Sequence, residues 1–420
     1  MSSVVPEGWS VKTFGDLTTS IKSGLSRRLS LQDIGIPVIN SGNLTSRGLD
    51  TRELKYWYLD DPQGANTSNY VLINGDILLN FINSISQIGK SCIFRSFGRP
   101  CIYTTNIFRV RVGEKSHSEF VHHLMTDDIF QEEIGLITKP AVNQASFTKD
   151  ELSNIRVSIP PLPEQKKIAS ILTSVDEVIE NTQKQIDKLQ DLKKATMNEL
   201  LTKGIGHTEF KDSESGRIPR SWEVKSLEHV CEKIWIGLVT TMTKFYVEKG
   251  IPLIRNSDIK ETGIRMSKLI QLDIDFSKKH SSRAVQKGDV VTVHTGDIGT
   301  SAVINHLLNG AQGFATLNSR INKSLIIPQF YSQILNSEDF KLRAKRVVTG
   351  DGRDNLNLKD FIGLLISVPQ SLSEQENIVT TLLSLEQNID RLTHKLSQTQ
   401  SLKKSLMQDL LTGKVRVTVN

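Results

Sequence analysis

The chain has 420 residues, of which 38% are hydrophobic and 23% are charged, and its formal net charge is +6. This length exceeds what one hydrophobic core usually serves, so we expect two globular units. The sequence contains no run of about 18 apolar residues that would span a bilayer, and its start lacks the basic and apolar regions of a signal peptide. It therefore predicts a cytoplasmic protein without membrane contacts.

Residues 1–160 are predicted to form a mixed α/β domain. Short apolar runs broken by Gly, Asn, Ser and Pro indicate strands, which lie at 37–39, 70–73 and 77–79. A helical pattern follows at 120–134. The domain closes with a strand and a group of prolines at 155–163, and because proline suits the first turn of a helix, we expect a helix to begin there.

A long helix is predicted over residues 161–204. Apolar residues recur in it at alternating spacings of four and three, which over several heptads indicates a coiled coil. A helix lying on a globular core would show a wider apolar stripe. The residues expected to form the coiled-coil seam are Leu172, Val175, Ile179, Ile186 and Leu189.

The second half of the chain repeats this order. A second mixed α/β domain is predicted over 205–370, with strands at 252–254 and 289–293 and a helical run at 329–346. A second long helix is predicted over 371–414, followed by a tail at 415–420. Its expected seam residues are Leu382, Leu385, Ile389, Leu392 and Leu396.

The repeat keeps a constant offset in the helices. Pro163-Glu164-Gln165 returns as Ser373-Glu374-Gln375, and Lys193-Lys194 returns as Lys403-Lys404, both 210 positions later (375 − 165 and 403 − 193). Upstream, Gly75-Asp76-Ile77 corresponds to Gly288-Asp289-Val290.

We therefore predict an α+β fold in which two mixed α/β domains form a pseudo-two-fold tandem repeat, separated by two long antiparallel coiled-coil helices. About 40 residues at 1.5 Å each would give a rod of roughly 60 Å, suited to a spacer. The alternative is that each helix packs on its own domain, and the length and repetition of the pattern count against it.

The basic excess is confined to one part of the chain. The long helices are neutral, with seven basic and seven acidic residues in 163–203 and five of each in 373–414. Residues 1–162 hold 16 of each, whereas 204–372 hold 23 basic and 18 acidic residues. This excess is compatible with nucleic-acid binding but does not prove it, because solvated surfaces account for most charge.

Patterns that indicate catalysis or metal binding are missing from the sequence. The segment 84–91 resembles a phosphate-binding loop, but Ser84 stands where the tight turn needs the first glycine. His122-His123 lacks the spacing that places two zinc ligands on one helical face, and Cys92, Cys101 and Cys231 lack a CxxC spacing. Neither the glycine-rich cofactor loop nor the target-base motif of a DNA methyltransferase occurs. The sequence predicts a non-catalytic chain without a metal or cofactor of its own.

Several motifs in a fixed order resemble one known family. They are Ile159-Pro160-Pro161-Leu162-Pro163-Glu164-Gln165, its copy at Ser373-Glu374-Gln375, the helix endings at 197–202 and 407–412, the openings Pro6 to Trp9 and Pro219 to Trp222, and the two Gly-Asp strands. Along its whole length the chain resembles the specificity subunit of type I restriction-modification systems.

The resemblance implies a role for each part of the chain. Each globular segment would be a target-recognition domain that reads one half of a bipartite double-stranded DNA target, and the helices would set the distance between the halves. The subunit would dock two methyltransferase subunits and, through them, two restriction subunits. S-adenosylmethionine, ATP and Mg are expected on these partners.

Two other interpretations remain open. The chain could be a bivalent coiled-coil scaffold that binds protein partners without reading DNA, although a scaffold should expose larger aromatic and aliphatic side chains. It could also be an enzyme with an unrecognised site, but no acid-base or metal constellation repeats between the copies.

Candidate DNA contacts are expected among polar side chains in loops between strands, because Arg and Lys suit guanine, Asn and Gln suit adenine, and basic groups hold phosphates. The alternative for each is a solvated or turn-capping side chain. The candidates in the first domain are Asn80, Ser84, Gln87, Lys90, Lys139, Asn143 and Gln144, and those in the second are His294, Thr295, Asp297, Arg346, Thr349 and Arg353.

Overall fold

The computed structural model describes residues 5–45, 48–348 and 355–419. It consists of two compact units, which we call unit 1 (residues 1–184 and 394–420) and unit 2 (residues 185–393). Each unit contains one globular domain together with one half of each long helix. The compact units therefore do not follow the domain and helix segments along the chain, because the two helices pack against each other in antiparallel pairs.

The globular part of unit 1 is a mixed α/β domain whose strands pair mainly in antiparallel fashion. Its central sheet has the order β2-β11-β7-β9, formed by Thr18–Ser23, Ile107–Val112, Ile77–Asn80 and Ser91–Ile93. A second sheet, β10-β3-β6, comprises Ile102–Tyr103, Ile36–Ile39 and Lys55–Trp57. Smaller sheets are β1-β14 (Ser10–Thr13, Arg156–Ile159), β4-β5 (Leu44–Thr45, Gly48–Leu49) and β12-β13-β8 (Lys139–Ala141, Gln144–Ser146, Ile82–Asn83). The helices are α1 (Ser118–Thr126), α2 (Asp128–Ile137) and α3 (Lys149–Ser153).

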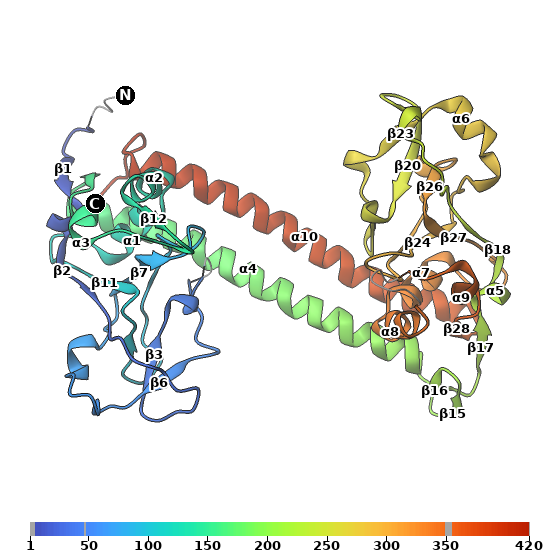
Figure 1. Ribbon diagram of the computed structural model, residues 1–420, viewed down its shortest axis with the longest axis horizontal. Helices are drawn as coiled ribbons and strands as arrows, with labels where there is room; N and C mark the ends of the chain where they lie inside the picture. The colour runs from blue at the N-terminus through green and yellow to red at the C-terminus, as the bar shows by residue number, and fades with distance from the viewer. Residues whose placement is uncertain (1–4, 46–47, 349–354, 420) are drawn as a thin grey trace. The chain divides into compact units, whose positions relative to one another are not determined.

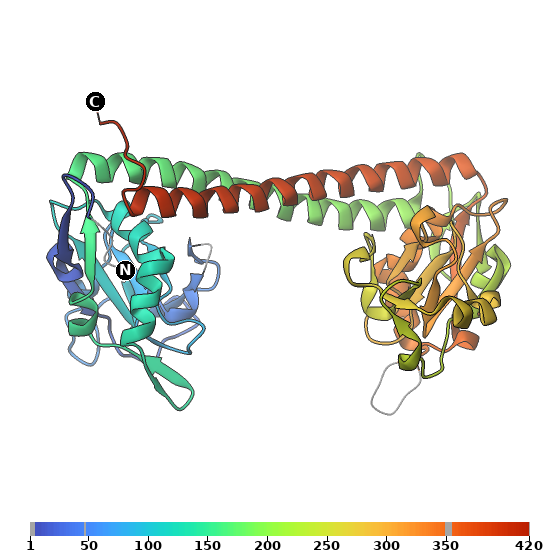
Figure 2. The ribbon, with the colours of Figure 1, turned by 90° about the horizontal axis from the view of Figure 1, so that it is seen from above.

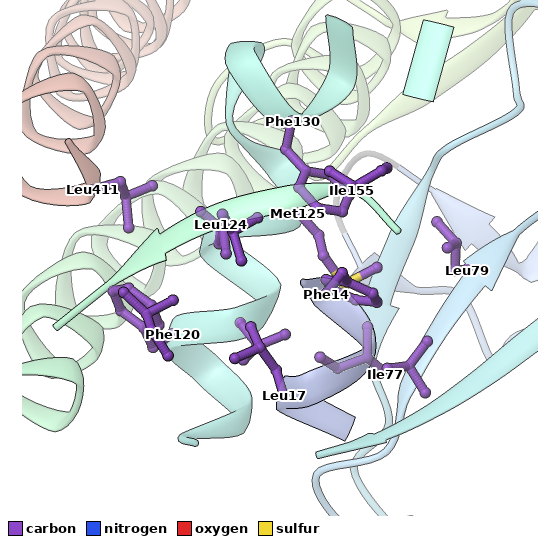
Figure 3. Close-up of a cluster of buried hydrophobic side chains, with 14 of the residues drawn as sticks. Phe14, Leu17, Ile77, Leu79, Phe120, Leu124, Met125, Phe130, Ile155 and Leu411 are labelled. Carbon is purple, nitrogen blue, oxygen red and sulfur yellow. The ribbon is translucent and has the colours of Figure 1, made fainter. Parts of the chain in front are cut away.

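The main core of unit 1 lies between the central sheet and these helices. Figure 3 shows Ile77 from the sheet and Phe130 from α2 close to Phe14, with Phe120 from α1 and Leu411 of the second long helix farther along the same cluster. All five side chains are buried. The C-terminal helix therefore takes part in the core of the N-terminal domain.

Unit 2 has a central sheet with the same strand order as that of unit 1, but its other sheets differ in part. Its central sheet is β18-β27-β24-β25, formed by Cys231–Ile236, Thr316–Ile321, Val290–Val293 and Ser301–Val303. The second sheet, β19-β23-β20-β26, comprises Tyr246–Val247, Ile270–Leu272, Ile251–Arg255 and Gln312–Phe314. Smaller sheets are β17-β28 (Trp222–Ser226, Leu365–Pro369), β15-β16 (Phe210–Ser213, Gly216–Pro219) and β21-β22 (Ile259–Lys260, Gly263–Ile264). The helices are α5 (Leu227–Val230), α6 (Ile274–Lys279), α7 (Pro328–Asn336), α8 (Glu338–Arg346) and α9 (Leu358–Ile362).

Each predicted helical run in the domains is divided into two helices at one residue. In unit 1 the break is at Asp127, whose side chain accepts a hydrogen bond from the Ile129 amide and caps α2. In unit 2 it is at Ser337, whose side chain accepts from the Phe340 amide and caps α8. A short polar residue that binds the next amides starts a new helix, which the apolar spacing alone did not reveal.

The strand predicted at 70–73 is wrong. Residues Thr67–Tyr70 form a 3₁₀ turn, and the residues after it are outside any strand. The buried guanidinium of Arg109 donates to the carbonyls of Asn69 and Val71 at 3.3 and 3.2 Å. These acceptors are thus satisfied by a side chain instead of a neighbouring strand.

The two long helices are α4 (Leu162–Lys203) and α10 (Leu372–Leu411), and within each unit they run side by side (Figure 1). In unit 1 an ion pair of 2.6 Å joins Asp176 of α4 to Lys403 of α10. In unit 2 an ion pair of 2.9 Å joins Lys193 of α4 to Glu386 of α10. The early part of each helix thus meets the late part of the other, which confirms the antiparallel arrangement.

These two ion pairs are copies of each other. Glu386 lies 210 positions after Asp176, and Lys403 lies 210 positions after Lys193 (386 − 176 and 403 − 193). The helices therefore pair in the same register in both units. The seam positions are buried at Leu172, Ile186 and Leu382 and half-buried at Val175, Ile179, Leu189, Leu385, Ile389, Leu392 and Leu396.

A buried glutamine at the start of each long helix joins that helix to its domain. In unit 1, Gln165 donates to the carbonyl of Pro160 at 3.0 Å and accepts from the amide of His117 at 2.9 Å. In unit 2, Gln375 donates to the carbonyl of Pro369 at 3.0 Å and accepts from the amide of Ile327 at 2.9 Å. The glutamine of each repeated Glu-Gln pair therefore has a structural role, because it holds the start of the helix to the domain.

The preceding glutamates bind the chain that follows the other helix. Glu164 accepts two hydrogen bonds from Arg416, at 2.7 and 2.8 Å. Glu374 interacts with His207 at 2.7 Å and accepts from the indole of Trp222 at 3.3 Å. The C-terminal tail is thus part of unit 1, where Arg416 also donates to the carbonyl of Glu7 at 2.7 Å.

Candidate nucleic-acid interface

The first group of candidate residues gathers around one edge of unit 1. Strand β13 pairs with β8 through Ala145 opposite Asn83 and Ser146 opposite Ile82. This pairing brings the loop after β8, residues 84–90, beside the β12-β13 hairpin, residues 139–146. In Figure 2 the hairpin projects from the domain on the side away from α4. Two loops that are far apart in the sequence therefore lie beside each other.

Asn80 is buried, whereas we predicted it as a DNA contact in an exposed loop. Its side chain is fully buried, and its amide lies 3.4 Å from the carbonyls of Ser41 and Gln87. Its backbone exchanges hydrogen bonds with Lys90 and Gly89, both at 2.9 Å. A buried side chain cannot reach a base edge, so Asn80 instead holds the two ends of the loop together.

The rest of the loop presents polar groups to solvent. Ser84 is exposed, and its carbonyl accepts from the amides of Gln87 and Ile88, which closes a turn. Gln87 and Lys90 are half-buried, and the Lys90 ammonium donates to the Gln87 side chain at 2.7 Å. A base contact by Gln87 would therefore compete with this internal hydrogen bond.

The hairpin carries the other three candidates of unit 1, and all are exposed. Lys139 forms an ion pair of 2.5 Å with Glu151, and this hydrogen bond, with those from Thr148, lowers the pKa of Glu151 to about 2. Asn143 has a φ of 62°, a conformation that asparagine tolerates better than most residues. Gln144 is the first residue of β13.

In unit 2 the corresponding loop follows β24. Thr295 forms an isolated β-bridge with Asn355, and the His294 carbonyl accepts from the amide of Leu356 at 2.9 Å. His294 is buried and its imidazole bonds to the Asn355 side chain. Burial lowers the pKa of His294 and the bond to Asn355 opposes this, so the ring is neutral near pH 7. It therefore positions the loop and does not supply a positive charge for phosphate.

The remaining candidates of unit 2 differ in how far the structure describes them. Asp297 is exposed, and its carboxylate accepts from the Thr300 hydroxyl at 2.7 Å. Arg346 is exposed at the last position of α8. Thr349 and Arg353 lie outside the described residues.

Sequence reasoning missed two apolar residues at the unit 1 surface. Ile85 lies in the loop after β8, and Val142 lies at the tip of the β12-β13 hairpin; both are strongly exposed. Only their position between the polar candidates could have drawn attention to them, because their side chains offer no hydrogen-bonding groups.

The two adjacent histidines of α1 pack on different elements, His122 beside the Ser91 carbonyl of β9 at 3.4 Å and His123 against α4. His123 is buried, its ring lies 3.3 Å from the Thr173 hydroxyl, and burial lowers its pKa to about 3. Within 5–45, 48–348 and 355–419, no three His, Cys, Asp or Glu side chains gather as metal ligands would. Of the helices described, none combines the length and apolar character required to cross a membrane.

The two Gly-Asp motifs are likewise structural. Asp76 forms a two-point ion pair with Arg111 at 2.7 and 2.8 Å, and Asp289 forms the same pair with Arg320 at 3.0 and 2.9 Å. Both aspartates are buried and also accept from a backbone amide three residues earlier. They fix the start of β7 and β24, the strands that lead into the candidate loops.

Comparison with known proteins identifies the same family that the sequence motifs resemble, over almost the whole chain. A family model described as "Type I restriction modification DNA specificity domain" matches residues 6–191 and 219–400. A protein from Methanocaldococcus jannaschii that carries the name putative type I restriction enzyme MjaX specificity subunit is 28% identical over 98% of this chain and 95% of its own length. The MjaVIII specificity subunit of the same organism is 30% identical over 64% of each chain.

The fold also matches a solved structure. The crystal structure of a type I restriction-modification system S subunit from M. genitalium superimposes with a TM-score of 0.60 at 15% identity, covering 96% of each chain. The predicted fold class and the predicted family are confirmed.

Proposed function

Because this chain belongs to the family of type I restriction modification DNA specificity domains, we propose that it reads a bipartite target in double-stranded DNA, one half-site with each globular domain. The observation that carries this proposal is the repeated position of the loops. The strands β7 and β24 occupy the same place in their sheets, and each is followed by a loop that exposes polar side chains, Ser84 and Ser86 in unit 1 and Asp297 in unit 2. Loops of this kind offer the hydrogen-bonding groups that base edges require.

We further propose that the paired helices act as the spacer between the two half-sites. The repeated ion pairs and the continuous seam support a stiff rod, because a register shift would separate both lysines from their carboxylates. The neutral charge of the helices suits contacts with protein more than with DNA.

In the assembled complex, the chain would serve as a non-catalytic scaffold in the cytoplasm. It would dock two methyltransferase subunits and, through them, two restriction subunits. S-adenosylmethionine, ATP and Mg would be bound by these partners. Sequence choice would come from this chain, and the chemistry from the others.

Methylation mapping of a host that carries the complete system tests the proposal. The expected result is one bipartite motif with a fixed gap, methylated only when this chain is present. A mobility-shift assay with co-expressed methyltransferase subunits should then show binding to that duplex. If partner subunits assemble on the chain but no sequence preference appears, the protein-scaffold alternative is favoured instead.

The two domains should also differ in their dependence on salt, because the basic excess lies in the second. Replacing Arg346 and Arg353 with glutamine should make the slope of log affinity against log salt shallower by about 0.9 for each phosphate that the protein no longer neutralises. Replacing Lys90 and Lys139 should change it less, since Lys139 already pairs with Glu151. Equal changes in slope would contradict this expectation.

A further inference from the structure

The tip of the β12-β13 hairpin carries a side chain that the turn does not need. Ala141 pairs with Gln144, so Val142 and Asn143 alone form the turn. The positive φ of Asn143 fits the third position of a type II turn, where glycine or asparagine is preferred. The second position favours proline or other turn-forming residues, yet it holds valine with 92% of its surface exposed. Local geometry therefore gives no reason for this valine.

A second apolar side chain lies on the adjoining loop. Because Asn83 pairs with Ala145 in antiparallel fashion, the chain that leaves β8 runs toward the hairpin tip. The backbone of Ser84 closes the turn with Gln87, and Ile85 between them is 72% exposed. Single exposed apolar residues are ordinary on protein surfaces. Here two of them stand on neighbouring segments that are joined by strand pairing.

Amide side chains accompany these apolar groups. Asn143 and Gln144 are both exposed and directly follow Val142. In the major groove an A·T pair presents two features side by side, the C5-methyl group of thymine and the N6 and N7 groups of adenine. Apolar side chains contact the methyl group, and asparagine or glutamine bonds to adenine. The hairpin tip combines both kinds of group.

We propose that this tip reads an A·T pair in the half-site of the first domain, with Val142 and Ile85 against the thymine methyl group and Asn143 or Gln144 on the adenine. This inference rests on the proposed function and names the base pair and the residues that select it.

A uracil-for-thymine exchange isolates the methyl group, because uracil keeps the same pairing and lacks only C5-methyl. A randomised bipartite duplex library is prepared once with thymine and once with uracil and is selected with the full chain and co-expressed methyltransferase subunits. For each thymine of the selected half-site, affinity is then measured with thymine and with uracil. The wild-type chain should lose about fourfold in affinity at one position, as expected for one buried methyl group.

Val142→Ala and Ile85→Ala should remove the preference for thymine over uracil at that position. Both variants should bind the uracil duplex with an affinity within about twofold of the wild type, because uracil has no methyl group for the wild-type side chains to contact. The matched control is Val11→Ala, a half-exposed valine on β1, outside both loops. It should keep the full thymine preference. Because Val142 is almost completely exposed, its replacement leaves the folded domain intact, which the melting temperature checks.

Each other outcome has a definite meaning. If the variants weaken binding equally on thymine and uracil duplexes, or leave the thymine preference unchanged, the apolar readout is overturned while sequence-specific binding stands. If the wild-type complex selects no motif from either library, the proposed function itself fails and this inference falls with it.

Discussion

Replacing Gln375 with leucine should loosen the attachment of α10 to the globular part of unit 2. The fully buried side chain of Gln375 donates to the carbonyls of Leu325 and Pro369, both at 3.0 Å, and accepts from the amide of Ile327 at 2.9 Å. Leucine has a similar volume, so the substitution removes the hydrogen bonds with little change in packing.

The size of the effect follows from the groups that are left without partners. A hydrogen bond between neutral groups contributes about 1 kcal/mol net, and a buried polar group left unpaired costs about 1–3 kcal/mol. Because the substitution removes three hydrogen bonds, we expect the free energy of local unfolding to fall by about 3 kcal/mol, which corresponds to an increase in local opening of about a hundredfold or more.

Hydrogen exchange followed by mass spectrometry measures this opening separately in each unit. Peptides covering residues 323–336 should exchange faster in the Gln375→Leu variant, while peptides of unit 1 keep their rates. Gln165→Leu should produce the mirror result, with faster exchange at residues 113–126. Gln400→Leu, at an exposed position of α10, is the control and should change neither region. Unchanged exchange at residues 323–336, or equal acceleration in both units, would refute the reasoning.

Three further results are expected. Inserting one heptad at matched positions of α4 and α10 should lengthen the paired helices by about 10 Å. The gap in the methylated motif should then grow by about three base pairs. An unchanged gap would count against the proposal that the helices act as a spacer. Burial lowers the pKa of His123 to about 3, so the unfolded state binds the proton more tightly than the folded state. The unfolding free energy of unit 1 should therefore decrease as the pH falls from about 6.5 toward 3, by up to about 1.4 kcal/mol per pH unit. Urea titrations of a His123→Gln variant should show a shallower dependence of the unfolding free energy on pH. Asp76→Asn should lower the unfolding free energy of unit 1 by about 2 kcal/mol, because it breaks the largely buried ion pair with Arg111. Asp50→Asn is the control, since its partner Arg52 is exposed, and it should change the unfolding free energy by less than about 1 kcal/mol. Urea titrations compare the two variants.

The repeat and the helices could be predicted because they depend on periodicity, which is local. The spacing of four and three places Leu172 and Leu382 on the same side of their helices as the other seam residues, because residues three and four positions apart share one helical face. The offset of 210 positions fixes the internal symmetry, and the ion pairs of Lys193 and Lys403 follow it. The antiparallel pairing therefore required little beyond the sequence.

The candidate interface could be predicted only as loops. Asn80 and Ser84 are both polar and lie four positions apart, yet one is fully buried and the other is exposed. Which of the two side chains reaches solvent depends on the hydrogen bond from Asn80 to the distant Ser41 carbonyl and on the pairing of β8 with β13. Contacts between distant segments of this kind leave no periodic trace in the sequence.

By itself, then, the sequence determined the doubling of the chain, the two helices and their seam, because each depends on residues a few positions apart. Only the tertiary structure decided that the C-terminal tail reaches Glu164 through Arg416 and that Gln165 and Gln375 join the helices to their domains. The same holds for the strand pairing that brings the segments of Ile85 and Val142 beside each other. These features arise where long stretches of chain return to the same place, and a buried or exposed environment exists only after that return.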